Sequence, residues 1–187
     1  GALYLTCEHH SISENGIEAI AKLPSLKMLN INLSPGEIEG TSLGSLENLK
    51  RLELGGGIRV DEEFIKTLSN CEKLEHLELS GPSTKITDSA VNQLTNLQGL
   101  RWLTLADFPI TDGCIESLAE LKKLEKLTLV NTKVTLQGIA ELQKALPNCK
   151  VEHDFTDEEI KAASQGLKSE NEGETAPENG EWEAVGN

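Results

Sequence analysis

The sequence predicts an α/β solenoid, in which short parallel strands alternate with helices around one continuous core. Its clearest sign is a 24-residue offset between residues 100–121 and 124–142, which both read Leu-x-x-Leu-x-Leu, a polar turn, and then Ile or Val followed by Thr. Alternating apolar residues predict a strand with one buried face, and the three- or four-residue spacing that follows predicts an amphipathic helix. Because only 3% of the residues are aromatic, repeated aliphatic layers must fill the core.

Each repeat contributes one predicted strand, marked by a pair of apolar residues that face the core. Successive markers are separated by 23–26 residues when the first member of each pair is taken as the reference. A further step of 24 residues reaches Val151, so a final strand is predicted near residues 149–151. The pairs are Leu3/Leu5, Leu29/Ile31, Leu52/Leu54, Leu77/Leu79, Leu103/Leu105 and Leu127/Leu129.

A helix is predicted after most of these strands. A residue suited to an N-cap precedes five of the apolar stripes, where its side-chain oxygen would accept an exposed amide N–H. The second unit is shorter and contains Pro35 and three glycines, so an irregular or 3₁₀ turn is expected there, and Pro147 should end the last helix. The expected caps are Ser13, Asp61, Thr87, Thr111 and Thr135, and the stripes are Ile17/Ile20/Leu23, Ile65/Leu68/Cys71, Val91/Leu94/Leu97, Ile115/Leu118/Leu121 and Ile139/Leu142.

The chain is expected to divide into repeats over residues 1–153, a capping helix over residues 154–167 and a disordered acidic tail over residues 168–187. Thr156 and Glu159 have the spacing of a capping box, and Gly166 suits the end of the helix. The tail is acidic, contains Gly and Pro and is nearly free of aliphatic residues. Since the sequence opens in the middle of a repeat, we expect it to be the C-terminal part of a longer protein.

The Leu-x-x-Leu-x-Leu strands with their helices resemble those of leucine-rich repeat proteins. The stretches ITDSAV, ITDGCI and VTLQGI are similar to the ribonuclease-inhibitor-like and cysteine-containing subclass, which includes many bacterial proteins. The resemblance covers about residues 1–153 and implies a horseshoe with a concave parallel sheet and convex helices. It also implies recognition of a protein or peptide. One departure is that the family's usual Asn after the strand is replaced by Ser34, Gly57, Pro82, Phe108 and Thr132.

Composition excludes several other classes of function. The net charge of −14 repels phosphate backbones, so a nucleic-acid ligand is not expected, and no apolar run reaches the length of a membrane span. Four cysteines in different repeats could form disulfides or serve as small apolar side chains, and the second interpretation is favoured. Free thiols would favour a reducing, cytoplasmic compartment. Oligomeric state is left open.

No catalytic, metal or cofactor site is predicted. The cluster Cys7-Glu8-His9-His10 has metal-ligand residue types, but adjacent His residues on a strand or turn point apart and no second ligand pair exists. Glycines 55–57 lack the Gly-Lys-Ser/Thr of a phosphate loop, and an acid pair on a shallow sheet lacks the pocket that glycosidase chemistry needs. An enzyme within these residues is therefore not expected.

The predicted binding site lies on the concave face, where the residues between the buried leucines point. Trp102 is its centre, because alternation keeps it out of the core and Trp, Tyr and Arg are enriched at binding hot spots. The alternative is that Trp102 merely covers its neighbours on a solvated sheet. The predicted site residues are Trp102, Arg101, His76, Arg51, Tyr4 and Lys126, with Glu53 and Glu78 setting the charge preference.

The function predicted is recognition of a protein or peptide through this concave sheet. Two alternatives remain open at this point. The chain could be the recognition region of a larger enzyme or regulator, such as a kinase or ubiquitin-ligase adaptor with its catalytic part upstream, or a structural spacer without a specific ligand. The tail segment EWEAV, which contains Trp182, could bind a basic partner or simply keep the protein soluble.

Overall fold

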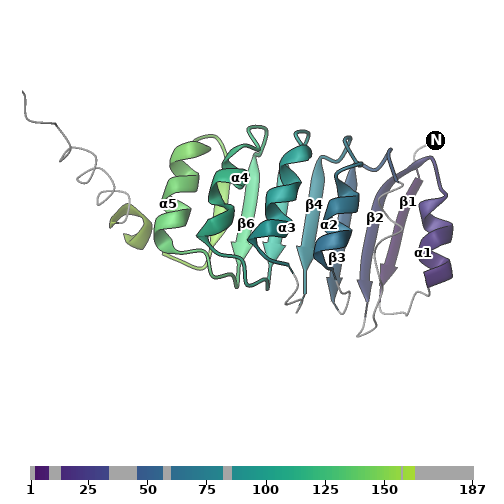
Figure 1. The fold of residues 1–187 in the computed structure, drawn as a ribbon, viewed down its shortest axis with the longest axis horizontal. Coiled ribbons are helices and arrows are strands. Elements are labelled where there is room, and N and C mark those ends of the chain that lie inside the picture. Colours follow the sequence, from purple (N-terminus) through teal and green to yellow (C-terminus); the bar gives the residue numbers. More distant parts are fainter. Residues whose placement is uncertain are drawn as a thin grey trace, which may run out of the picture.

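The computed structural model describes residues 3–8, 14–33, 46–56, 60–81, 86–156 and 158–162. They form one parallel sheet of seven strands whose spatial order follows the sequence, and the helices lie against one face of that sheet (Figure 1). This confirms the predicted α/β solenoid. Within the described ranges, every helix is too short or too polar to cross a membrane.

Buried leucines of neighbouring strands lie directly beside one another in the sheet. In the central strands the second and fourth residues are buried, and each pairs with its counterpart one repeat along, as Leu52 does with Leu77 and Leu103 with Leu127. A final strand is present where Val151 predicted one. The strands are β1 (Leu3–Glu8), β2 (Leu26–Leu33), β3 (Arg51–Gly56), β4 (His76–Ser80), β5 (Trp102–Ala106), β6 (Lys126–Val130) and β7 (Lys150–His153).

Short helices follow the strands and form the second layer. Neighbouring strands lie about 4.8 Å apart, whereas packed helices need about 8–10 Å, so the sheet must take the inner side of the curve. Two repeats combine α and 3₁₀ turns. The elements are α1 (Glu14–Ala21), α2 (Glu62–Leu68), α3 (Asp88–Asn92), η2 (Gln93–Asn96), η3 (Asp112–Cys114), α4 (Ile115–Ala119) and α5 (Leu136–Ala145), and residues 158–162 are also helical.

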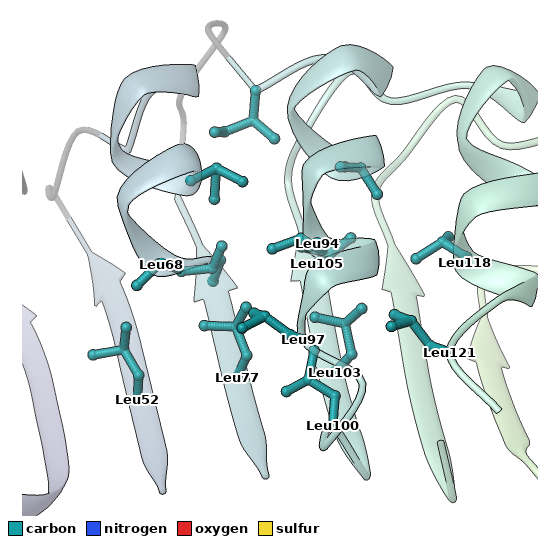
Figure 2. Packing of buried hydrophobic residues seen from close by; sticks show 14 of the residues in the cluster. Leu52, Leu68, Leu77, Leu94, Leu97, Leu100, Leu103, Leu105, Leu118 and Leu121 are labelled. Atoms are coloured by element: carbon teal, nitrogen blue, oxygen red, sulfur yellow. The ribbon is translucent and has the colours of Figure 1, made fainter. Parts of the chain in front are cut away.

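The core lies between the two layers. Figure 2 shows leucines from the strands, such as Leu77 and Leu103, meeting leucines from the helical segments, such as Leu94 and Leu118. These side chains are at most 1% exposed, and complete burial of a Leu contributes about 1.5–3 kcal/mol relative to exposure. Ile160, from the helical residues near the C-terminus, is also buried in the same cluster.

The predicted N-caps are realised to different degrees. Asp61 accepts the backbone N–H of Phe64 at 2.9 Å, and Thr111 and Thr135 each accept a glycine N–H at 3.2 Å. Thr87 occupies the N-cap position with extended backbone, but its side chain makes no capping hydrogen bond. Ser13 lies outside the described residues.

The structure describes two of the residues that replace the family's usual Asn after the strand, Phe108 and Thr132. Phe108 takes that position after β5 and is 1% exposed, so an apolar side chain fills the space. The residue just before this position has a positive φ in four repeats, and it is Gly56, Gly81, Asp107 or Asn131, residue types that tolerate this conformation. The side-chain amide of Asn131 then donates to Asp107 Oδ1 at 2.9 Å, which links two repeats.

One sequence prediction is wrong. Leu3 was expected to align with Leu29, but Leu5 pairs with Leu29, Tyr4 pairs with Met28, and a bulge separates Leu3 from Tyr4. Leu3 is 39% exposed, whereas Leu5 packs against the core. The sequence LYLTC offers two apolar pairs with the same alternation, and a shift of two residues leaves the same faces buried, so the pattern could not choose between them.

The capping box predicted near the C-terminus is present. Thr156 and Glu159 bond reciprocally as a capping box requires: the backbone N–H of Thr156 donates to Glu159 Oε2 at 2.8 Å, and the N–H of Glu159 donates back to Thr156 Oγ1 at 3.4 Å. The irregular turn expected around Pro35 and the acidic tail lie outside the described residues. Cys71, Cys114 and Cys149 are free thiols, the first two buried.

Candidate functional site

One face of the sheet carries none of the described helices (Figure 1). We call this the open face, and its side chains form columns because the strands are in register. The first column reads Tyr4, Met28, Arg51, His76, Trp102, Lys126 and Lys150, and the second reads Thr6, Asn30, Glu53, Glu78, Thr104, Thr128 and Glu152. Because of the corrected β1 register, Tyr4 and Thr6 each lie one column from where the sequence placed them.

Trp102 lies on the open face of β5, with 44% of its surface exposed. Its ring packs against that of His76 on β4, with centroids 4.4 Å apart and planes inclined by 41°. The two residues are direct cross-strand partners, so the sheet register itself creates this aromatic pair. The arrangement holds the large indole in one place and leaves part of it accessible.

His76 is the electrostatically unusual member of the pair. Its Nδ1 atom is buried and has no hydrogen-bond partner. Burial, followed by the positive charge of Arg51, lowers the pKa of His76 below its ordinary value, although Glu75 acts in the opposite direction. The imidazole is therefore neutral at neutral pH.

Around this pair the open face is hollowed. The hollow has a volume of about 130 Å³, which suits one side chain rather than a whole small molecule. It brings together six of the eight residues that the sequence predicted. Its lining is Arg51, Glu53, His76, Leu77, Glu78, Trp102, Leu103, Thr104 and Lys126.

The two basic side chains of the hollow each have an acidic partner. Arg51 forms an ion pair with Glu53, whose other carboxylate oxygen accepts from the side-chain amide of Asn30. Lys126 pairs with Glu152 of β7 at 2.9 Å. Glu152 also accepts from Lys150 at 2.8 Å, and the hydrogen bonds from these two lysines lower its pKa to about 2.

Glu78 differs from these acids. It lies in the second column between Glu53 and Thr104, and it lines the hollow. Its side chain is exposed, and within the described part of the chain it has no hydrogen-bond or ion-pair partner. It therefore contributes the only unpaired charge among the hollow-lining residues.

Two predicted residues lie outside the hollow. Tyr4 is on the edge strand β1 and is 66% exposed, about 19 Å from the Trp102 strand if strands are spaced at about 4.8 Å. Arg101 precedes β5, where its guanidinium forms an ion pair with Glu125. The structure thus separates both residues from the group around Trp102.

Arg101 belongs to a charged row that the sequence reading missed. Lys50 pairs with Glu75 at 2.5 Å, and Arg101 pairs with Glu125, so charges of opposite sign alternate from one repeat to the next. A shallow groove runs along this row. The signal was present in the sequence, since each of the four residues immediately precedes one of four successive strands. Exposed pairs of this kind add little stability.

The described residues include no group of three or more His, Cys, Asp and Glu side chains that could hold a metal ion. His9 and His10 lie outside those residues. The hollow presents an accessible indole, a neutral imidazole, two internal ion pairs and one carboxylate that has no partner among the described residues.

Solved structures with a similar fold are leucine-rich repeat proteins. An internalin, InlF, from Listeria monocytogenes matches with a TM-score of 0.58 and 21% identity over 82% of this chain and 41% of the internalin chain. Internalin C2 from the same species matches with a TM-score of 0.55 and 19% identity, over 82% and 74%. A chain of the PEPR1-AtPEP1 structure matches with a TM-score of 0.52 and 19% identity, over 73% and 23%.

These likenesses show that the chain has the leucine-rich repeat fold. At 19–21% identity they show the fold alone, without the subclass or a ligand. The chain spans less than half the length of the InlF chain. No protein-family model and no curated protein matches the sequence.

Proposed function

We propose that this leucine-rich repeat solenoid recognises a segment of another protein through the open face of its sheet, with Trp102 as the anchor. The observation that carries the proposal is the position of Trp102. It is partly exposed, packs against His76, and lines a hollow on the face that carries none of the described helices.

The shape of the open face favours a protein or peptide ligand. Small-molecule sites enclose most of their ligand in clefts of about 300–1,000 Å³, whereas this hollow is smaller and opens onto a long sheet. A solenoid sheet instead offers columns of fixed side chains to an extended partner. The hollow suits a single side chain of such a segment, and the neighbouring strands can contact the residues on either side.

The energetics of interfaces also favour Trp102. Binding energy concentrates in a few residues, often Trp, Tyr and Arg, that are surrounded by contacts which exclude water. Here the surrounding contacts are the ion pairs Arg51–Glu53 and Lys126–Glu152. Both members of each pair belong to this chain, so a bound segment would cover the pairs without having to rearrange them.

The test is selection of binding peptides from a random twelve-residue display library with the full chain as the target. The dissociation constant of each selected peptide is then measured by calorimetry for the wild type and for Trp102→Ala. If Trp102 is the anchor, its truncation weakens binding by about 30-fold or more, the effect of a hot-spot residue.

The control is Gln137→Ala, an exposed position on α5 that leaves binding unchanged. Circular dichroism must show that both variants remain folded. Peptides that bind the wild type and Trp102→Ala equally well would contradict the proposal. A selection that yields no binders to the wild type would instead favour a spacer without a specific ligand.

A further inference from the structure

We propose, on the basis of the proposed function, that the hollow on the open face selects a basic segment of the partner. An Arg or Lys side chain of that segment would lie against the Trp102 ring, with its cationic group at the Glu78 carboxylate. The proposal concerns the chemistry of the partner, which neither the fold nor the similar structures specify.

The distribution of charge in the hollow is the first argument. Each cation there is already neutralised, Arg51 by Glu53 and Lys126 by Glu152, while Glu78 has no partner among the described residues. A carboxylate is most stable beside a cation with which it can form hydrogen bonds, and an Arg guanidinium provides both. The hollow therefore lacks one positive charge.

An acidic anchor would be opposed by the same charges. An incoming carboxylate would compete with Glu53 for Arg51 or with Glu152 for Lys126, and it would meet Glu78 at close range. Glu152 is held by two lysines and by Thr128, whose hydroxyl donates to it at 3.1 Å. Like charges brought together in an interface weaken binding and exclude wrong partners.

The position of Trp102 relative to Glu78 is the second argument. Trp102 pairs with His76, and Glu78 follows His76 by two residues on the same face of β4. One strand spacing of about 4.8 Å and two residues of about 3.3 Å each place their Cα atoms about 8 Å apart. A planar guanidinium can lie over the indole and still reach the carboxylate across this distance.

The state of His76 is the third argument. A protonated imidazole next to the indole would repel a cation, but burial keeps the pKa of His76 low, and the ring is neutral at neutral pH. The two aromatic rings together therefore present a surface without positive charge. A bound cation would therefore meet the neutral aromatic pair on one side and the Glu78 carboxylate on the other.

The charge of the whole chain acts in the same direction. A net charge of −14 raises the local concentration of basic segments and speeds their encounter with the protein. This long-range attraction does not determine where on the protein the segment binds. The contact between Glu78 and the partner's cation would determine the binding position.

The test uses the peptides selected against the wild type and adds two further targets, Glu78→Gln and Glu78→Lys. The expected result is a basic residue at one common position of the wild-type peptides. Binding of these peptides weakens about tenfold in Glu78→Gln, and selection against Glu78→Lys yields an acidic residue at that position. Replacing the common Arg by citrulline, which has the same shape without the charge, reproduces the loss.

Glu116→Gln is the matched control, since it removes the same charge from an exposed position of α4. It separates the contact from the effect of net charge. If binding requires Trp102 but not Glu78 or a basic residue, the inference fails and the proposed function stands. If binding is indifferent to Trp102 as well, both fail.

Discussion

The carboxylate of Asp112 holds Thr135 of the following repeat by two hydrogen bonds, from the backbone N–H at 2.8 Å and from the hydroxyl at 2.6 Å. Thr135 Oγ1 in turn accepts the N–H of Gly138 and caps α5. Asp88 holds Thr111 of the next repeat in the same way. In these two repeats the capping threonine is thus positioned by an acid from the repeat before it.

This relationship gives Gly138 an unusual role. A Cβ atom at this position would collide with Oδ1 of Asp112, so glycine leaves the space that the carboxylate needs. Gly113 does the same for Asp88, whose Oδ2 would lie 2.7 Å from the added Cβ. Glycine in a helix otherwise costs about 0.5–1 kcal/mol relative to Ala.

The effect of Gly138→Ala should therefore depend on residue 112. In the wild type we expect Gly138→Ala to destabilise the fold by about 1–2 kcal/mol, because the carboxylate is displaced from Thr135. In an Asp112→Ala background we expect the same change to cost much less, because only the contact of the added Cβ with Val134 Cγ1, at 3.2 Å, remains. Urea unfolding of the four proteins measures the coupling, and strictly additive free energies would contradict the explanation.

Phe108 should be one of the most sensitive positions in the core. It is fully buried at the position where related repeats carry Asn, and Phe108→Ala should reduce the free energy of unfolding by about 3–5 kcal/mol. The half-buried Phe155 provides a comparison, and its truncation should cost less. Urea denaturation decides the order of the two effects, and equal losses would show that Phe108 is not a core residue of this importance.

His76 should report pH through the fluorescence of Trp102. Protonated His quenches a neighbouring indole, and the pKa of His76 is lowered, so the quenching midpoint should lie below about 6.5. The measurement is made in a Trp182→Phe background, where Trp102 is the sole tryptophan. In His76→Gln the transition should vanish, and a midpoint at or above 6.5 would contradict the structure.

The same shift affects stability. Since His76 binds its proton more weakly in the folded state than in the unfolded state, the unfolded state takes up more protons below pH 6.5. The free energy of unfolding should therefore fall as the pH decreases from about 6.5 to the lowered pKa of His76 in the folded state. Below that pKa, His76 causes no further loss. Relative to the wild type, His76→Gln should lose this part of the pH dependence in urea titrations.

The cysteines should differ in reactivity. Burial raises the pKa of Cys71 to about 11 and that of Cys114 to about 12, so neither is a thiolate at pH 8. Cys149 is only half-buried. In a Cys7→Ser background, a disulfide reagent such as dithionitrobenzoate should modify Cys149 first and the other two only after unfolding. Rapid modification of all three in the native protein would contradict this order.

Much of the architecture could be predicted because it depends on local periodicity. Alternation in β5 put Leu103 and Leu105 in the core and Trp102 outside, and three-residue spacing identified the buried faces of the helices. Asp61 and Thr135 were recognisable as caps for the same reason, since a cap is made within one helical turn. These features need only neighbours along the chain.

The candidate site was predictable in composition but not in arrangement. Six predicted residues line one hollow, while Tyr4 and Arg101 lie apart from it. Tyr4 was misplaced because a two-residue shift of β1 preserves the same alternation. Arg101 is next to Trp102 in the sequence, but its side chain pairs with Glu125 and does not line the hollow.

By itself the sequence determined that this protein is a repeating α/β solenoid with Trp102 on its uncovered sheet, because periodicity fixes which side of each element is buried. Only the tertiary structure decided that Trp102 packs on His76, that Asp112 holds Thr135, and that Glu78 has no partner among the described residues. The first two relationships join residues of different repeats, 26 and 23 positions apart. They depend on how neighbouring strands align and on which partner each side chain reaches. The sequence pattern within one repeat contains no information on either point.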